Sequence, residues 1–199
     1  MECQVSDTCR KISEFVVVKN LYSTKTSKVF QALHKSSGVQ LALKCYSKQH
    51  MMDLQKIQAV REIWFHSHLF HPYIISLYAA WMEKGQICLA IEYAPIGSAF
   101  RKLRKLGCFP EVMSAKYVIY PILCSLSFLH EMGLMHRDIK PENILLTSDG
   151  CKLADLGLVI NHKEEAANTC LGTFDYMARP YFSFNLLELI REVTVPRSG

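Results

Sequence analysis

The 199-residue sequence lacks the cysteine spacing of a zinc site or of a disulfide framework. Its eight cysteines are scattered, and no two of them form a C-x-x-C pair; they stand at positions 3, 9, 45, 88, 108, 124, 151 and 170. Several lie inside apolar runs, where a free cysteine behaves as a small hydrophobic residue. We therefore expect reduced thiols in a cytoplasmic or nuclear protein.

The sequence also lacks targeting and membrane signals. Its first residues are polar and acidic, without the apolar core of a secretory signal. The longest apolar stretch, residues 117–129, is interrupted by Pro121 and is predicted to be too short to cross a bilayer. We expect a buried helix there and no membrane partner.

A strong excess of one charge is absent as well. The net charge is +5, which does not by itself argue for nucleic acid. The basic run at residues 101–105 is interpreted as one solvated helix face that could meet acidic substrates. Nucleic acid is therefore not an expected partner.

What is present is the composition of a globular protein with a substantial core, since half of the residues are hydrophobic and 21% are charged. No repeat or low-complexity linker divides it. Alternating and β-branched runs predict strands early in the chain, with a hairpin turn at 36–38; the strands are expected at 15–18, 29–33, 39–44, 75–81 and 87–92.

Helical spacing predicts the remaining elements. A helix is expected from Asp53 to Leu69, with Ile57, Val60 and Ile63 or Trp64 as its periodic apolar residues. After a break at 95–97, the pattern becomes mainly helical; further helices are expected at 98–106 and 114–132. The order of elements predicts an α+β fold with a β-rich small lobe, one main helix and a helical second lobe.

The most informative stretch runs from His136 to Gly157. Its polar residues His136, Arg137, Asp138, Lys140 and Asn143 are followed by the triplet Asp155-Leu156-Gly157. Residue by residue, this resembles the catalytic loop and the metal-binding triplet of eukaryotic protein kinases. A polar loop between two strands is the alternative, and it does not account for this combination of residues and spacing.

The resemblance implies a role for each of these residues in phosphoryl transfer, which depends on positioning and on neutralising phosphate charge. Asp138 would orient the substrate hydroxyl and accept its proton, and Lys140 would balance the charge of the migrating phosphoryl group. Asn143 and Asp155 would supply hard oxygen ligands for Mg²⁺. The implied cofactors are ATP and Mg²⁺.

The same resemblance extends into the N-terminal third. Lys44 is similar to the lysine that contacts the ATP phosphates, and Glu62 is placed to pair with it. Residues 89–95 resemble the last small-lobe strand and the hinge, with Ile91 as gatekeeper. Backbone groups of Glu92 and Ala94 would bind adenine; the side chains expected to enclose its faces are those of Val29, Ala42 and Leu145.

Residues 168–178 look like the end of an activation segment. The tract from Glu92 to Ala178 resembles the Aurora kinases and their serine/threonine relatives more than tyrosine kinases. Lys140 and Gly172-Thr173 imply protein substrates with serine or threonine hydroxyls. Thr169 is a candidate phosphorylation site, where a phosphate could pair with Arg137, with an unmodified exposed threonine as the alternative.

The sequence departs from the kinase pattern in its nucleotide loop and in its metal triplet. The positions of the loop glycines are taken by Tyr22, Thr24 and Ser27, and side chains there are expected to loosen contact with phosphates. Leu156 replaces the usual phenylalanine of the triplet. We expect that change to be tolerated, because leucine can fill the same apolar space.

The kinase pattern also stops at Ala178, and a divergent tail follows. The organisation expected is a small lobe at 1–92, a hinge at 93–97, an incomplete large lobe at 98–178 and a tail at 179–199. An incomplete lobe would expose apolar helix surface to a regulatory protein partner. Two functions therefore remain open: an active serine/threonine kinase, or a catalytically impaired regulatory protein.

Overall fold

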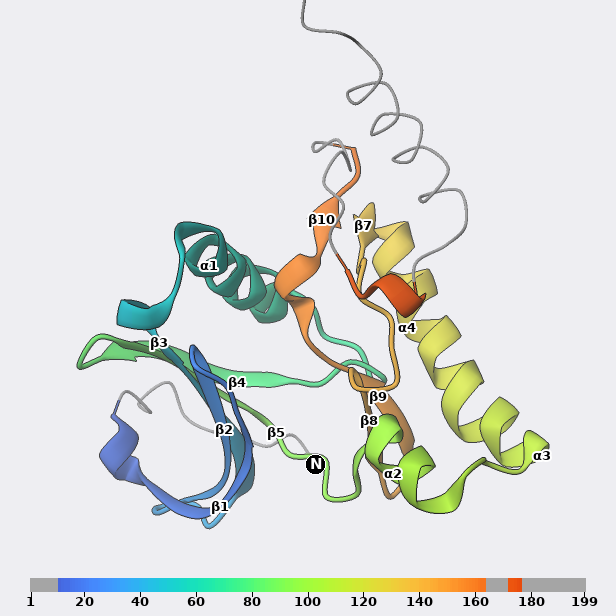
Figure 1. Ribbon diagram of the computed structural model, residues 1–199, viewed down its shortest axis with the longest axis horizontal. Helices are drawn as coiled ribbons and strands as arrows, with labels where there is room; N and C mark the ends of the chain where they lie inside the picture. Colours follow the sequence, from blue (N-terminus) through green and yellow to red (C-terminus); the bar gives the residue numbers. More distant parts are fainter. Residues whose placement is uncertain (1–10, 164–171, 177–199) are drawn as a thin grey trace, which may run out of the picture.

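The N-terminal lobe is built on a five-stranded antiparallel sheet in the computed structural model, which describes residues 11–163 and 172–176 (Figure 1). The sheet has the order β1-β2-β3-β5-β4; its strands are β1 (Phe15–Ser23), β2 (Ser27–His34), β3 (Gln40–Ser47), β4 (Leu77–Glu83) and β5 (Gln86–Glu92). β3 and β5 lie between other strands, and most of the buried residues of the sheet are on these two strands.

Two strands differ from the predicted ranges. β1 continues beyond residue 18 to Ser23, because its polar second half pairs with β2 as far as the partners Ser23 and Lys28. β4 begins at Leu77 rather than at residue 75. Ile75 is buried instead in the connection to the second lobe, where its N–H donates to the carbonyl of Leu153.

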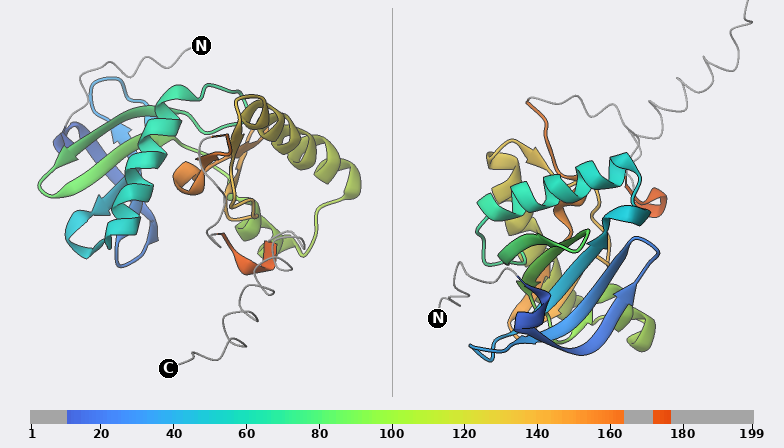
Figure 2. Two further views of the ribbon diagram at one scale, coloured as in Figure 1. Left: turned by 90° about the horizontal axis from the view of Figure 1, so that it is seen from above. Right: turned by 90° about the vertical axis from the view of Figure 1, so that its left-hand side faces the viewer.

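Helix α1 (Asp53–His68) matches the expected range within a residue, but it buries a different face from the one predicted. Its buried residues are Ala59, Glu62, Phe65 and His66. The predicted apolar positions Ile57, Val60 and Trp64 are more than half exposed. Of the predicted positions, Ile63 does pack, partly buried, against a core cluster. The prediction was wrong for the others because the buried face of α1 includes the carboxylate of Glu62 and the imidazole of His66. Figure 2 shows α1 on the side of the first lobe that faces the second lobe.

The second lobe combines helices with short strands, and the α+β prediction is confirmed. Its helical elements are α2 (Ala99–Leu106), α3 (Glu111–Ser114), η3 (Ala115–Ile119), α4 (Tyr120–Glu131), η4 (Leu156–Leu158) and η5 (Phe174–Tyr176). Its strands are β6 (Gly97–Ser98), β7 (Leu134–Met135), β8 (Ile144–Thr147), β9 (Gly150–Leu153) and β10 (Ile160–Asn161). The chain segments just before and just after the β8–β9 hairpin face the first lobe (Figure 1).

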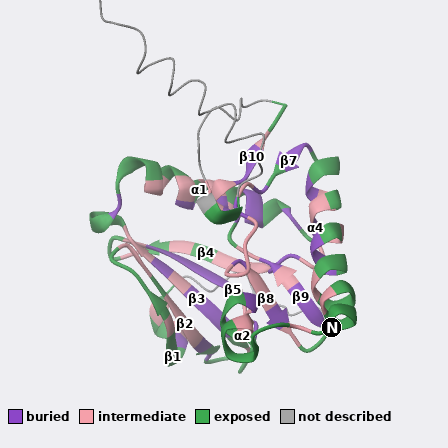
Figure 3. Cartoon of the chain, turned by 45° about the vertical axis from the view of Figure 1, so that its right-hand side comes forward, coloured by how far each residue is buried: buried purple, intermediate pink, exposed green. Residues whose placement is uncertain are grey.

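The long helical stretch Glu111–Glu131 corrects the expectation about membrane spans. Within the described part of the chain, the length and composition of this stretch would allow it to cross a membrane. Its inner side nevertheless packs on the core of the second lobe through Pro121, Ile122, Ser125 and Leu129. A core helix of a soluble protein passes the same test, so the stretch alone is weak evidence for a span. Figure 3 shows how much of its outer side is exposed.

The main hydrophobic core joins the two lobes. Phe65 and Leu69 from α1 and the connection pack with Leu129, Leu153 and Leu156 of the second lobe. Leu156 is fully buried, so it fills the apolar site of the metal triplet as expected. This shared core holds α1, and therefore Glu62, against the segment that carries Asp155.

Candidate active site

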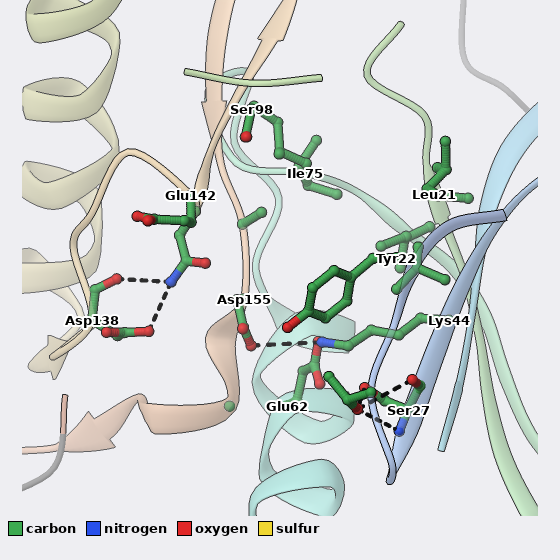
Figure 4. Close-up of a pocket in the computed structure, with 18 of the residues that line it drawn as sticks. Leu21, Tyr22, Ser27, Lys44, Glu62, Ile75, Ser98, Asp138, Glu142 and Asp155 are labelled. Atoms are coloured by element: carbon green, nitrogen blue, oxygen red, sulfur yellow. Dashed lines mark hydrogen bonds and ion pairs between the residues drawn. The ribbon is translucent and has the colours of Figure 1, made fainter. Parts of the chain in front are cut away.

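A cleft of about 1680 Å³ lies between the lobes, and Figure 4 shows the side chains that line it. The structure brings twelve of the predicted site residues to its walls: Val29, Ala42, Lys44, Glu62, Ile91, Glu92, Ala94, Asp138, Lys140, Asn143, Leu145 and Asp155. They come from β2, β3, α1, β5, the hinge and the loops around β8 and β9. The remaining predicted residue, Thr169, lies outside the described residues.

Lys44 and Glu62 form a buried ion pair between β3 and α1. Lys44 Nζ lies 2.7 Å from Glu62 Oε1, and their side chains are 13% and 2% exposed. Lys44 Nζ is also 3.6 Å from Asp155 Oδ1, across the cleft. The lysine thus connects the small lobe to the metal triplet of the second lobe.

Tyr46 completes this pair, although the sequence did not single it out. Its hydroxyl donates a hydrogen bond of 2.5 Å to Glu62 Oε2, so each carboxylate oxygen of Glu62 has a donor. The Lys44 ammonium lies 5.1 Å from the centre of the Tyr46 ring. Residues i and i+2 of a strand share a face, which is the signal that could have placed Tyr46 beside Lys44.

The charges across the cleft shift one another's pKa values. Burial lowers the pKa of Lys44, but the Asp155 and Glu62 carboxylates outweigh burial and raise it well above the ordinary value. The Lys44 ammonium in turn lowers the pKa of Asp155 against the effect of burial. Burial and the Glu62 carboxylate raise the pKa of Tyr46. Lys44 is therefore an ammonium, Asp155 a carboxylate and Tyr46 a neutral donor at neutral pH.

Asp138 is the centre of a second polar network. Its Oδ2 accepts from Asn143 Nδ2 at 2.9 Å and pairs with Lys140 Nζ at 2.7 Å. Its Oδ1 accepts from the Thr173 hydroxyl at 2.8 Å, and Lys140 Nζ donates to the same hydroxyl at 2.8 Å. A threonine hydroxyl thus lies between a carboxylate and an ammonium. The sequence had linked Thr173 only to substrate preference, not to this contact.

His136 ties this network to the metal triplet. It is buried, and burial lowers the pKa of its imidazole, so the ring is neutral at neutral pH. Its Nδ1 accepts from the Asp138 N–H at 3.3 Å, which leaves Nε2 as the protonated nitrogen that donates to the Ala154 carbonyl at 3.2 Å. The ring therefore sets the distance between the catalytic loop and Asp155.

Asp155 itself has an uncommon backbone. Its φ of 65° lies in the left-handed region, which non-glycine residues seldom occupy. The preceding residue is held by a hydrogen bond from the Ala154 N–H to the Asn143 carbonyl at 2.9 Å. Such conformations concentrate at functional sites, where the surrounding contacts impose them. The left-handed conformation of Asp155 directs its carboxylate toward Lys44.

The loop between β1 and β2 differs from a glycine-rich phosphate loop in a specific way. The Thr24 hydroxyl accepts from the N–H groups of Ser27 at 2.9 Å and of Thr26 at 3.3 Å. The Thr24 N–H donates to the Ser27 carbonyl at 2.8 Å. Tyr22 points into the cleft on the side of Lys44 (Figure 4). The loop amides that glycines would leave open to phosphates are occupied by the loop's own side chain and carbonyl.

Sequence comparison assigns the chain to a known family. The protein kinase domain family matches residues 15–181. The chain belongs to the protein kinase family.

Within that family its relatives are Aurora kinases. It is 35% identical over 171 residues to an Aurora kinase of Debaryomyces hansenii, covering 83% of this chain and 41% of the relative. It is 36% identical over 168 residues to Aurora/IPL1-related protein kinase 2 of Caenorhabditis elegans, covering 83% of this chain and 55% of the relative. Aurora kinase A-A of Xenopus laevis is 35% identical over 168 residues, with 83% and 41% covered. The chain is thus similar to the Aurora serine/threonine kinases, and it spans about half the length of these curated relatives.

We expect Tyr46→Phe to lower the free energy of unfolding by about 1–3 kcal/mol, because a buried carboxylate oxygen of Glu62 loses its donor. Urea unfolding followed by circular dichroism measures the change. Tyr22→Phe, at a tyrosine that is 60% exposed, serves as the matched control and should change little. Equal stability of both variants would show that the Tyr46 hydroxyl does not support Glu62.

We expect Lys44→Met to raise the pKa of Asp155, because the ammonium is the largest cause of its low value and burial acts in the opposite direction. In the unchanged protein the lowered pKa adds stability that is present above the ordinary aspartate pKa and is lost as pH falls through the folded-state value. Carbon-detected NMR titration of the Asp155 carboxyl measures the shift. Lys56→Met removes only the surface pair with Asp53 and should leave Asp155 unmoved; an unmoved Asp155 in Lys44→Met would contradict the assignment.

Proposed function

We propose that this chain is a serine/threonine protein kinase that binds ATP with Mg²⁺ and transfers the γ-phosphate to protein hydroxyls. The observation that carries the proposal is the convergence of Lys44, Asp138, Asn143 and Asp155 on one cleft between the lobes. Phosphoryl transfer needs these groups as a set, because catalysis consists of positioning and of charge neutralisation.

The hinge supports the placement of adenine. The Glu92 N–H is taken by the Ser76 carbonyl at 2.9 Å. The Glu92 carbonyl, at the end of β5 where the chain leaves the sheet for the hinge, is the group that we propose for adenine. The Ala94 carbonyl accepts from the Gly97 N–H at 3.2 Å, so Ala94 would offer its N–H. Donor and acceptor are then of the two kinds that an adenine edge requires, and apolar side chains line the cleft beside them; these are Val29, Ala42, Ile91 and Leu145.

The residues on the opposite wall fit a magnesium ion. Asn143 uses its amide nitrogen in both hydrogen bonds to Asp138, which leaves its side-chain oxygen as a ligand. The ionised Asp155 carboxylate offers a second hard oxygen. Mg²⁺ takes such oxygens together with phosphate oxygens and water. Bound there, the ion would neutralise phosphate charge beside Lys44.

Asp138 is the residue that we assign to the acceptor hydroxyl. The Thr173 hydroxyl donates to Asp138 Oδ1 and accepts from Lys140 Nζ, so a hydroxyl fits between these two groups. Asp138 would orient that hydroxyl and accept its proton as the bond to phosphorus forms. Lys140 would hold the transferred group through charge.

Two observations favour the second candidate function, that of a catalytically impaired regulatory protein. The loop amides next to Thr24 are already hydrogen-bonded, which weakens a phosphate site. On the outer side of the long helical stretch, Ile119, Tyr120 and Leu123 are each more than half exposed, which suits a protein partner. The two functions differ in whether phosphate is transferred.

We expect the chain to transfer labelled γ-phosphate from ATP·Mg²⁺ to a generic basic protein substrate. Asp138→Asn should lower the rate about 100-fold or more, because the proton acceptor is lost. Lys44→Met should also abolish transfer, through loss of the phosphate contact and of the Glu62 pair. Filter-bound radioactivity over time is the measurement.

Lys56→Met is the control for Lys44→Met, since it removes an exposed lysine from the same lobe. It should leave the rate unchanged. A folded, soluble wild-type protein with no more transfer than Asp138→Asn would overturn the kinase assignment and support the regulatory one.

We expect the triple change Tyr22→Gly, Thr24→Gly and Ser27→Gly to tighten ATP binding about tenfold, which corresponds to about 1.4 kcal/mol. The change removes the Thr24 hydroxyl that occupies the loop amides and the Tyr22 ring that lines the cleft. Calorimetric titration with ATP·Mg²⁺ measures the affinity. Val18→Gly adds flexibility at an exposed residue of the same strand and should not tighten binding; unchanged or weaker binding by the triple variant would refute the explanation.

A further inference from the structure

Two buried cysteines lie directly opposite each other in the first sheet, on the side away from the cleft. Cys45 of β3 is the register partner of Cys88 of β5. Both belong to the small-lobe core, where they are 8% and 0% exposed. Lys44 precedes Cys45 and points to the other face of the sheet, into the cleft. The cysteine pair therefore lies on the opposite face of the sheet from the cleft and does not belong to the site.

The hydrogen bonds of β3 show which neighbour Cys45 is bonded to. The Ser47 N–H donates to the Thr26 carbonyl of the β2 side at 2.8 Å. Backbone groups of an antiparallel strand alternate in direction from residue to residue, so those of Cys45 also point to β2. Cys45 therefore makes no backbone hydrogen bond with β5.

The hydrogen bonds of β5 show that Cys88, too, is bonded to the strand on its other side. The Glu92 N–H donates to the Ser76 carbonyl next to β4 at 2.9 Å, so by the same alternation the backbone groups of Cys88 point to β4. Cys45 and Cys88 thus form a non-hydrogen-bonded pair, the closer of the two kinds of antiparallel pair.

That kind of pair has the spacing of a disulfide. Its Cα atoms lie about 4.5 Å apart and its side chains leave the sheet on the same face. Disulfides join cysteines with Cα atoms about 4.4–6.8 Å apart. We propose that Cys45 and Cys88 are a redox-sensitive thiol pair, which peroxide converts to a reversible disulfide between β3 and β5.

The environment of the pair favours Cys45 as the first thiol to react. The Cys88 thiol, as a hydrogen-bond partner, lowers the pKa of Cys45, whereas that interaction and burial raise the pKa of Cys88. The thiolate is the reactive form of cysteine. Cys151 gives the contrast: it is buried without such a partner, and burial raises the pKa of its thiol to about 11.

Hydrogen peroxide is a small enough oxidant for a site with little exposure. The Cys45 thiolate attacks one peroxide oxygen, the O–O bond breaks, and a sulfenic acid and hydroxide form. Cys88 then loses its proton and attacks the Cys45 sulfur, and the S–O bond breaks. Hydroxide takes that proton and leaves as water. Two thiols and one peroxide give one disulfide and two waters.

The disulfide would cross-link the strand of Lys44 to the strand that leads into the hinge. These two strands carry both ends of the proposed nucleotide site, but the proposal does not depend on catalysis. Its chemistry can be followed in a chain with no measurable transfer.

The test uses the full chain, reduced, freed of reductant and treated with hydrogen peroxide. Remaining thiols are blocked with N-ethylmaleimide in denaturant, and trypsin then releases Cys45 and Cys88 on separate peptides, residues 45–48 and 85–101. We expect mass spectrometry to find these two peptides joined as the main disulfide, and separate again after dithiothreitol. Both peptides carrying N-ethylmaleimide, higher oxides or links to other cysteines would overturn the proposal.

Three controls separate the sheet geometry from ordinary thiol oxidation. Oxidation in guanidinium chloride should scatter links among the eight cysteines, because the strand pairing is gone. Cys151→Ser should keep the Cys45–Cys88 link. Cys88→Ser should leave a Cys45 sulfenic acid that dimedone traps. An equal share of the Cys45–Cys88 link with and without denaturant would show that the fold does not direct it.

Trp81 supplies a second readout in the unmodified chain. It is the register partner of Cys88 on β4 and belongs to the same core cluster. A disulfide quenches the fluorescence of an adjacent indole, so emission should fall on oxidation and recover with reductant. Cys45→Ser should abolish that change; a fall in emission that persists in Cys45→Ser would show that oxidation elsewhere causes the quenching.

Discussion

The buried Lys44–Glu62 ion pair is the contact on which the cleft depends. A carboxylate that is 2% exposed costs several kcal/mol to bury unless its oxygens are paired. Here one oxygen takes the Lys44 ammonium and the other the Tyr46 hydroxyl. The pair therefore fixes α1 on the sheet and at the same time holds Lys44 toward Asp155. Stability of the small lobe and geometry of the site rest on the same three side chains.

The second half of the site is held by a separate mechanism, mostly through backbone groups. His136 bridges Asp138 and Ala154, and the Ala154 N–H returns to the Asn143 carbonyl. Asp138, Asn143 and Asp155 are thus linked to one another by contacts within the second lobe. The two halves meet through Lys44 and Asp155 and through the core around Leu156.

The sequence predicted the elements and the chemistry of the catalytic loop because both are local patterns. Strand alternation and helical spacing located α1 within a residue and the strands of the sheet within a few residues. The sequence did not predict the features that depend on packing between elements. The buried face of α1 was misassigned because Glu62 and His66 find their partners outside the helix, in Lys44 and Tyr46 of β3 and in the Ile75 carbonyl. The Tyr46–Glu62 bond, the Thr173 contact and the Cys45–Cys88 pair likewise arise from register and packing between distant segments.

The loop of Thr24 argues for a weakened kinase, whereas the catalytic loop argues for an active one. Because the two loops lie at different places in the cleft, each should affect a different step, nucleotide binding or transfer. In the proposed nucleotide site, Thr24 and Tyr22 would lie at the phosphate end, whereas Asp138, Lys140 and Asn143 have their own network across the cleft. A loop whose amides are already hydrogen-bonded would give less binding energy to the proposed ATP, but it leaves the Asp138 network and Asp155 in place. The glycine substitutions should therefore appear first in the affinity for ATP, while changes in the Asp138 network should appear in the rate of transfer.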